Sequence, residues 1–364
     1  MNVKPQAASN GPGRLAFADA VRGLAALWVV LFHLAAGSHI ADLLGLFPDT
    51  LRFVLFDQGH LGVAAFFVLS GFVMALNTAR ASATSAFTLR FVARRLVRLT
   101  PPYYFAIGLS LAFLLIKAQW FGAVVEWPSW QGLAAHAFYL QDMLLYPQIN
   151  GVFWTLCVEV QFYIVFAILL WIIQRFGNDA SLNLRRTIVL WIGGVLALAW
   201  PLGVLQDPGW AGSFLPYWYS FAGGAVVSWG WLHKGKAMLL AWTYCAAAGL
   251  VAYISGDEFA VVAAATALML LLAANLGGMG RWMNFRWAQF LGLISYSLYL
   301  IHNNIIGGTY RVVGKLLPAG LEAQIVGAVL SMILCILFSW MMFRWIEKPC
   351  IGWSRKISVR KGQS

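Results

Sequence analysis

The chain is 364 residues long, and 61% of its residues are hydrophobic while only 10% are charged. A soluble domain carries about 25% charged residues, so this surface cannot face water on all sides and a soluble globular enzyme is excluded. The same apolar excess excludes an intrinsically disordered chain, which requires low hydrophobicity. A polytopic membrane protein is the class that remains.

The formal net charge is +12, from 25 Lys and Arg against 13 Asp and Glu. In a soluble chain such a balance indicates nucleic-acid binding. In a membrane protein the same excess arises because Lys and Arg are concentrated in cytoplasmic loops. We therefore expect the charge to record orientation in the lipid bilayer, with no nucleic acid as partner.

Apolar stretches of membrane-spanning length recur along the chain. A helix needs about 20 such residues to cross about 30 Å of hydrocarbon, and helix is expected because lipid offers no partners to backbone polar groups. The pattern predicts an all-α fold with about ten spanning helices. The predicted spans are 20–40, 58–77, 101–118, 152–174, 187–206, 213–232, 237–255, 259–276, 287–307 and 323–343. Segment 132–146 is too short and too polar to span, so we expect a short re-entrant or interfacial helix there.

The distribution of basic residues predicts the orientation. With the N-terminus in the cytoplasm, only four of the 25 Lys and Arg fall outside, namely Arg52, Lys117, Arg311 and Lys315. This satisfies the positive-inside rule and puts both termini in the cytoplasm. The predicted parts are a cytoplasmic tail 1–19, a transmembrane domain 20–343 and a basic cytoplasmic tail 344–364.

Arg22 and His33 are ionisable residues of the first predicted span. Such a group costs about 2.5–3.5 kcal/mol at the centre of a spanning helix, so each requires a partner or a function. Their spacing puts His33 about 16 Å farther along the helix, with Arg22 at the inner face and His33 in the outer half. His33 is a candidate general base, and a hydrogen bond between helices is the alternative.

Glu159 lies in the span 152–174, at a predicted depth similar to that of His33. Its carboxylate either orients an imidazole or is buried in its neutral form. Arg95 and Arg98 are three residues apart, so they face the same way on a helix. Guanidinium groups at the inner boundary bind phosphates in bidentate fashion, and anchoring to anionic lipid is the alternative.

His60 and His302 lie near the outer ends of their predicted spans, where either can line an outward cavity or serve in packing. The sequence has no His-Glu-x-x-His motif, paired-Asp motif or Gly-rich phosphate loop, so no metal site is expected. The four cysteines lack CxxC spacing and are expected to be free packing residues.

Five blocks spread over residues 19 to 349 form an ordered set. They are Asp19-Ala-Val-Arg22-Gly with His33, residues 62–72, Arg95-x-x-Arg98 with Pro-Tyr-Tyr, Trp154-Thr-Leu-x-Val-Glu159-x-Gln-Phe-Tyr163, and residues 294–302 with Arg344-x-x-Glu347-Lys-Pro. Together they resemble the membrane-integral acyltransferase family 3, whose members acylate sugars of bacterial exopolysaccharides, lipopolysaccharides and peptidoglycan. Two positions depart from the family pattern: Ala64 stands where many members have an acidic residue, and Thr155 where Ser is common.

The resemblance implies a reaction at the bacterial inner membrane. A short acyl group, chiefly acetyl, would pass from cytoplasmic acyl-CoA to a hydroxyl of an envelope or exported polysaccharide or glycolipid. Acetyl-CoA would be the donor substrate, with no permanently bound cofactor. We expect the protein to be an O-acetyltransferase-like enzyme whose partners are the bilayer, acyl-CoA and this acceptor.

The resemblance also suggests which residues carry the reaction. Arg22, Arg95 and Arg98 would bind acyl-CoA, and His33 would deprotonate the acceptor or carry the acyl group, with Glu159 as its orienting partner. The candidates for the acceptor side are His60, Trp154, Tyr163 and His302.

Two other functions remain open at this level. A proton-coupled secondary transporter would use His33 and Glu159 as a proton relay within the membrane. A noncatalytic scaffold of a polysaccharide export complex would have no need for these buried ionisable groups.

Overall fold

The protein is described by a computed structural model that covers residues 15–79, 81–176, 182–206 and 212–357. Most of the predicted tail 1–19 and the last residues of the predicted tail 344–364 lie outside these ranges. The described residues form helices and connecting turns, with no strand among them, which confirms the all-α prediction.

The longer helices are α1 (Ala16–Ala36), α4 (Gly62–Thr78), α5 (Ser85–Phe121), α7 (Trp154–Arg175), α8 (Leu182–Ala197), α9 (Trp218–His233), α10 (Gly235–Ser255), α11 (Glu258–Asn275), α12 (Arg286–Leu316) and α13 (Leu321–Met342). The shorter ones are α2 (Ala41–Leu44), α3 (Asp49–Arg52), η1 (Phe53–Asp57), η2 (Gly59–Leu61), α6 (Trp130–Ala137), η4 (Leu215–Tyr217), η5 (Phe343–Glu347) and α14 (Lys348–Lys356).

Within the described ranges, seven helices are long and apolar enough to cross a membrane, which supports a multi-pass membrane protein. The predicted number of ten is not reached by this measure. The helices α8 and α9 have 16 residues each, which is short for a crossing. Helix α12 has 31 residues but is too polar to be recognised from composition alone.

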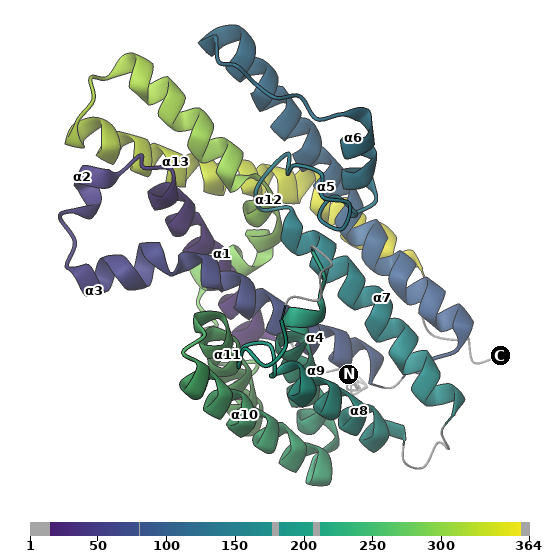
Figure 1. Ribbon diagram of the computed structural model, residues 1–364. Coiled ribbons are helices and arrows are strands. Elements are labelled where there is room, and N and C mark those ends of the chain that lie inside the picture. The colour runs from purple at the N-terminus through teal and green to yellow at the C-terminus, as the bar shows by residue number, and fades with distance from the viewer. Residues whose placement is uncertain (1–14, 80, 177–181, 207–211, 358–364) are drawn as a thin grey trace, which may run out of the picture.

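Helices α1 and α4 occupy the middle of the molecule. Helix α1 packs on α12 and on α4, and α4 in turn packs on α9. Figure 1 shows α8, α9, α10 and α11 gathered below these two helices, with α5, α12 and α13 above them. The site described below lies between these middle helices and the upper group, where α1, α4, α5, α7 and α12 converge.

Glycine allows the closest helix contact, between α4 and α9. An added Cβ would lie 1.9 Å from the carbonyl oxygen of Phe221 at Gly71, and 1.9 Å from that of Val68 at Gly224. No side chain fits at such distances, so the two backbones touch directly. Close approach through small residues is the usual way to pack helices in lipid, where burial of apolar surface gives no advantage.

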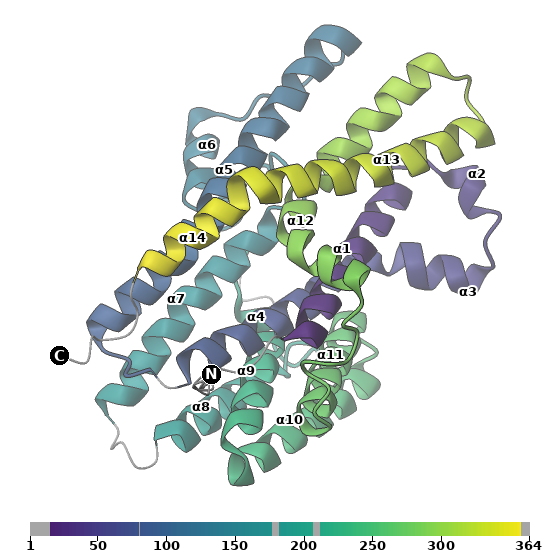
Figure 2. The ribbon, with the colours of Figure 1, turned by 180° about the vertical axis from the view of Figure 1, so that it is seen from behind.

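Helix α13 continues through η5 into α14 as one long bent rod (Figure 2). The segment η5 is π-helical, and α14 packs along the first part of α5. Helix α5 itself has Pro101 and Pro102 in its interior. Proline removes a backbone donor and bends a helix, so α5 is locally distorted at its two prolines. The rod formed by α13, η5 and α14 is distorted at its π-helical segment.

The segment 132–146 begins within the eight-residue helix α6 (Trp130–Ala137) and contains no other helix. At 1.5 Å per residue this helix is about 12 Å long, far short of a crossing, as the sequence predicted. The chain that follows α6 is not a long helix, and its residues alternate between exposed and buried: Gln141 and Phe153 are fully buried, whereas Leu144 is 55% and Leu145 78% exposed. Single residues of this segment, such as Gln141 and Phe153, therefore reach the protein interior before α7 begins.

Candidate active site

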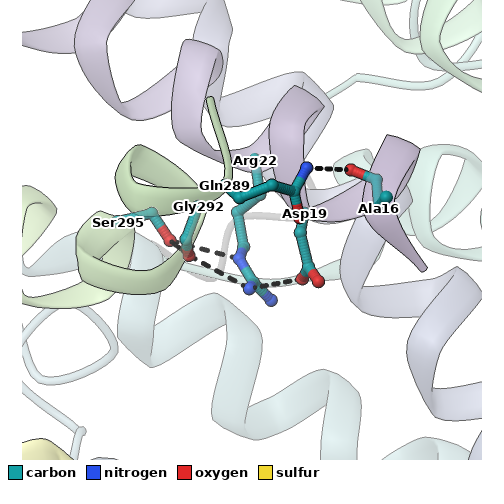
Figure 3. Close-up of polar contacts among 6 residues, drawn as sticks. All are labelled: Ala16, Asp19, Arg22, Gln289, Gly292 and Ser295. Atoms are coloured by element: carbon teal, nitrogen blue, oxygen red, sulfur yellow. Dashed lines mark hydrogen bonds and ion pairs between the residues drawn. The ribbon is translucent and has the colours of Figure 1, made fainter. Parts of the chain in front are cut away.

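Arg22 lies where α1 and α12 approach most closely (Figure 3). An added Cβ at Gly23 would lie 2.5 Å from Gly292 N, and one at Gly292 would lie 2.2 Å from Asp19 O. Arg22 therefore reaches α12, where Nη2 donates to Gly292 O at 3.1 Å and Nε donates to Ser295 Oγ at 3.1 Å. It also forms an ion pair with Asp19 at 2.8 Å. Two helices thus hold the guanidinium in one orientation.

A cavity of about 190 Å³ opens beside Arg22. Side chains of α1, α4, α5, α7 and α12 line it, together with Glu347 of η5. Apolar side chains alternate with charged and hydroxyl groups. The polar lining consists of Asp19, Arg22, Ser70, Arg95, Arg98, Glu159, Tyr163, Ser295, Tyr296, Tyr299 and Glu347.

Arg95 and Arg98 both line this cavity, so the structure confirms that they share a face of α5. Arg94, one residue earlier, is exposed and lies outside it. The Arg95 guanidinium lies over the Tyr163 ring, 5.4 Å from its centroid, a distance at which cation–π attraction acts.

The two cavity arginines of α5 have no ion pair. Within the described ranges, the side-chain ion pairs are Arg22–Asp19 and Arg52–Asp57. No carboxylate of these ranges therefore lies within ion-pairing distance of Arg95 or Arg98, although Glu159 and Glu347 line the same cavity. Two unpaired guanidinium groups beside a cavity form a site that is suited to an anion with planar or tetrahedral oxygens.

Glu159 lies in the cavity with these arginines, not beside His33 as the sequence suggested. Its Oε1 accepts a hydrogen bond from Ser70 Oγ at 2.5 Å and another from the Tyr163 hydroxyl. The sequence places Glu159 only by its distance from the end of its predicted span, and this distance does not determine which helices lie beside it.

Glu347 is a cavity residue that the sequence analysis did not assign to the site. It is 2% exposed, and Ser297 Oγ donates to its Oε2 at 2.7 Å. It ends the π-helical segment η5, a type of distortion that is rare and frequent at functional sites. The signal available in the sequence was its position in the Arg344-x-x-Glu347 block.

His33 contacts His302 of α12. Nδ1 of His33 lies 3.2 Å from Nε2 of His302, and the ring centroids are 4.8 Å apart. His302 is fully buried, whereas His33 is partly exposed. The sequence predicts His33 in the outer half of its span and His302 near the outer end of its own, and it does not pair them.

Tyr299 connects the cavity with this histidine pair. It lines the cavity, and its ring centroid lies 6.0 Å from that of His302, one turn away on α12. Its hydroxyl lies 2.8 Å from Thr155 Oγ1, which fixes the ring. The arginine side and the histidine side of the site therefore lie along the same two helices, α1 and α12, about three turns apart on α1.

Among the four residues predicted for an acceptor side, Tyr163 lines the cavity and the others do not. His60 is exposed, with Nδ1 3.2 Å from Asp57 O. Trp154 packs in an aromatic cluster, with its ring centroid 5.7 Å from that of Tyr217.

Metal ligands and reactive thiols are not gathered at the site. In the part of the chain that the structure covers, no three His, Cys, Asp or Glu side chains are close enough to hold a metal ion. The four cysteines are free and buried, as expected for packing residues, and they are Cys157, Cys245, Cys335 and Cys350.

Fold and site together define a helical, multi-pass membrane protein with a cavity between its helices that is lined by arginine, carboxylate and hydroxyl groups. Residues 15–344 match a family described as an acyltransferase domain. The chain therefore belongs to this family, the acyltransferase family 3 that its motifs resemble, and it is an acyltransferase.

Two relatives illustrate the range of the family. The exopolysaccharide production protein ExoZ of Rhizobium meliloti (strain 1021) is 28% identical over 322 residues, which cover 84% of this chain and 94% of ExoZ. The O-acetyltransferase OatA of Staphylococcus aureus (strain NCTC 8325 / PS 47) is 22% identical over 376 residues. This match covers 91% of this chain but 56% of OatA, so the chain spans little more than half of that relative. No solved structure matches the chain.

Proposed function

We propose that this acyltransferase moves an acetyl group from acetyl-CoA to a hydroxyl group of an exported or envelope polysaccharide. The names of the two relatives support the acetyl group and the polysaccharide acceptor, since one relative is named for exopolysaccharide production and the other for O-acetyl transfer. In this proposal the protein lies in the bacterial inner membrane with both termini in the cytoplasm, and acetyl-CoA enters from that side.

The observation that carries the proposal is the unpaired state of Arg95 and Arg98 in the cavity. Coenzyme A carries several phosphates, and guanidinium groups bind phosphate through two parallel hydrogen bonds. Anchoring to anionic lipid is a weaker explanation, because arginines that serve only as anchors have no reason to line an interior cavity. Arg22, held by α12, supplies a third positive group at the same cavity.

The length of the donor fits the separation of the two parts of the site. The eleven-residue step from Arg22 to His33 on α1 corresponds to about 16 Å along the helix axis. Coenzyme A has a long pantetheine arm between its phosphates and its thioester. The phosphates can therefore bind at the arginines while the thioester extends toward His33.

In the proposed reaction, Nε2 of His33 takes the proton of the acceptor hydroxyl as the oxygen attacks the thioester carbonyl. The carbon–sulfur bond then breaks, the acceptor keeps the acetyl group as an ester, and His33 returns the proton to the CoA thiolate. Glu159 would contribute from the cavity, where it fixes Tyr163 beneath the guanidinium of Arg95.

A proton-coupled transporter is not favoured. Its relay would require His33 and Glu159 to exchange protons, whereas Glu159 is hydrogen bonded to Ser70 and Tyr163, and His33 is bonded to His302.

The test is acetyl transfer by the purified full chain in proteoliposomes. The protein is incubated with acetyl-labelled CoA, with and without bacterial exopolysaccharide, and the label is followed on sugar and on protein. We expect an alkali-labile acetyl ester on the polysaccharide, with one free CoA thiol for each ester formed. Absence of transfer and of CoA release with every glycan acceptor offered would contradict the proposal.

A further inference from the structure

The two histidines at the crossing of α1 and α12 each have one ring nitrogen directed at backbone carbonyl oxygens. Nδ1 of His302 lies 3.0 Å from Leu298 O and 2.8 Å from Tyr299 O. Nδ1 of His33 lies 2.9 Å from Val29 O. A carbonyl oxygen can only accept a hydrogen bond, so in both rings Nδ1 must carry the proton.

This assignment determines the remaining nitrogens. A neutral imidazole with its proton on Nδ1 has a lone pair on Nε2. Nε2 of His302 is therefore an acceptor, and the group 3.2 Å away is the Nδ1–H of His33. The hydrogen-bond directions are consistent throughout, with Nδ1–H of His33 shared between Val29 O and His302 Nε2. Among the described residues, Nε2 of His33 is the ring nitrogen of this pair that has no hydrogen-bond partner.

We propose that His302 is a positioning residue that holds His33 in the Nδ1–H form, with the lone pair of Nε2 available to a substrate proton. The inference rests on the proposed function, in which His33 is the base. His302 is fully buried and packed against Tyr299, so it acts through His33 and does not itself contact the acceptor.

The proton balance of the step is simple. When Nε2 of His33 takes the hydroxyl proton, the ring becomes an imidazolium, and its Nδ1–H now donates a charge-assisted hydrogen bond to Nε2 of His302. His302 keeps its own proton on Nδ1, bound to the two carbonyl oxygens. The Nε2 proton of His33 leaves with the CoA thiolate, which restores the starting state. His302 thus has the position that an orienting group takes in other base-assisted acyl transfers.

A first test reads the tautomers directly and does not depend on activity. The full chain is labelled with ¹⁵N in the histidine rings, reconstituted in lipid and measured by solid-state NMR. Signals are assigned by their loss in His33→Gln and His302→Gln. We expect both rings to be neutral with the proton on Nδ1. An Nε2–H ring at His302 would overturn the inference.

A second test uses two amides that differ in where they place their polar group. His302→Gln puts an amide near the position of Nε2 and retains an acceptor for His33, whereas His302→Asn puts it near Nδ1 and does not. Because general-base catalysis contributes about 10²- to 10⁴-fold, we expect His302→Gln to retain kcat within about tenfold and His302→Asn to lose about 100-fold or more. KM for acetyl-CoA should stay unchanged in both.

The controls separate this inference from the proposed function. His39→Gln alters a histidine in the turn after α1 that stacks on Tyr310, and it should leave kcat unchanged. If His33→Gln abolishes transfer while His302→Asn has the wild-type rate, the role of His302 is contradicted and the proposed function stands. If His33→Gln itself retains wild-type kcat, the proposed function fails in its mechanism. Equal loss in His302→Gln and His302→Asn would also contradict the role, since it would indicate a purely structural residue.

Discussion

At the scale of single residues, the charged groups of the cavity differ in how they are paired. Arg22 is bound to Asp19 and to α12, Glu347 accepts from Ser297, and Glu159 accepts from two hydroxyls. The guanidinium groups of Arg95 and Arg98 are left for a ligand. Orientation rules explain why a membrane protein has arginines at one end of its helices, but not why two of them line a cavity.

Removing these two arginines should weaken donor binding without affecting the chemical step. Hydrogen bonds to charged groups contribute about 1.5–3 kcal/mol each, so Arg95→Ala and Arg98→Ala should each raise the Kd for acetyl-CoA by about 10- to 100-fold. Calorimetric titration of the purified protein with acetyl-CoA measures this. Arg94→Ala is the matched control, since Arg94 is exposed and outside the cavity, and it should bind as the wild type does. Equal weakening in all three variants would attribute the effect to general surface charge.

The residues of the candidate site were largely visible in the sequence, but their grouping was not. Polar side chains within apolar stretches singled out Arg22, His33 and Glu159 as functional candidates. Which of them touch depends on helix contacts that one sequence does not contain. His302 was noted as a possible cavity residue, and only the packing of α12 on α1 shows it against His33.

At the scale of elements, the contact between α1 and α12 holds the site together. It brings Arg22 to the backbone of α12 at one level and His33 to His302 about three turns farther along. Both contacts depend on the close approach at Gly23 and Gly292. The two ends of the reaction path are therefore positioned by one helix pair.

Widening this contact should impair catalysis. In Gly292→Ala the new Cβ would lie 2.2 Å from Asp19 O, so the helices must separate. Overpacking costs about 1–3 kcal/mol, and a displacement of about 1 Å in a site can reduce the rate about 100-fold. We expect a lower Tm in detergent and a kcat reduced by about that factor.

The control for this substitution lies on the same helix. Gly314 of α12 has no atom within 4 Å of an added Cβ, so Gly314→Ala should leave both Tm and kcat close to the wild type. A wild-type Tm and kcat in Gly292→Ala would show that the close approach of α1 and α12 is not required for stability or catalysis.

The position of Glu159 on α7 shows why its neighbours could not be predicted. Apolar periodicity locates a span and gives the distance of a residue from its end. The neighbours of Glu159 are Ser70 of α4 and the arginines of α5, which line the same cavity. Contacts between helices that are far apart in the chain leave no periodic pattern in one sequence, so the grouping of Glu159 with these arginines follows only from the structure.

At the scale of the whole molecule, composition was sufficient for the fold class but not for the number of crossings. The all-helical, multi-pass architecture followed from the apolar excess and the lack of water in lipid. The helices that depart from the prediction are α8, α9 and α12. Helix α9 is buried at almost every position and short, and α12 is polar because it carries site residues, so neither has the apolar composition and length of a lipid-facing span.

The predicted orientation can be tested on the two ends of α5. The four native cysteines are buried, so labelling of an added, exposed cysteine can be measured without a background from them. In Trp120→Cys the thiol is at a position that is 74% exposed, and in Arg94→Cys it is near the arginine end of the helix. An impermeant maleimide should label position 120 in intact cells, and position 94 only after permeabilisation. The reverse pattern would put the arginines outside and exclude cytoplasmic acetyl-CoA as the donor.

The central claim is that donor binding at the arginines and acetyl transfer at His33 are separate functions of one site. The measurement that tests it most directly is the rate of labelled acetyl transfer by His33→Ala at saturating acetyl-CoA, together with its Kd for acetyl-CoA. We predict that the rate falls by about 10²- to 10⁴-fold, as for loss of a general base, while the Kd stays at the wild-type value. Transfer at the wild-type rate by this variant would contradict the account.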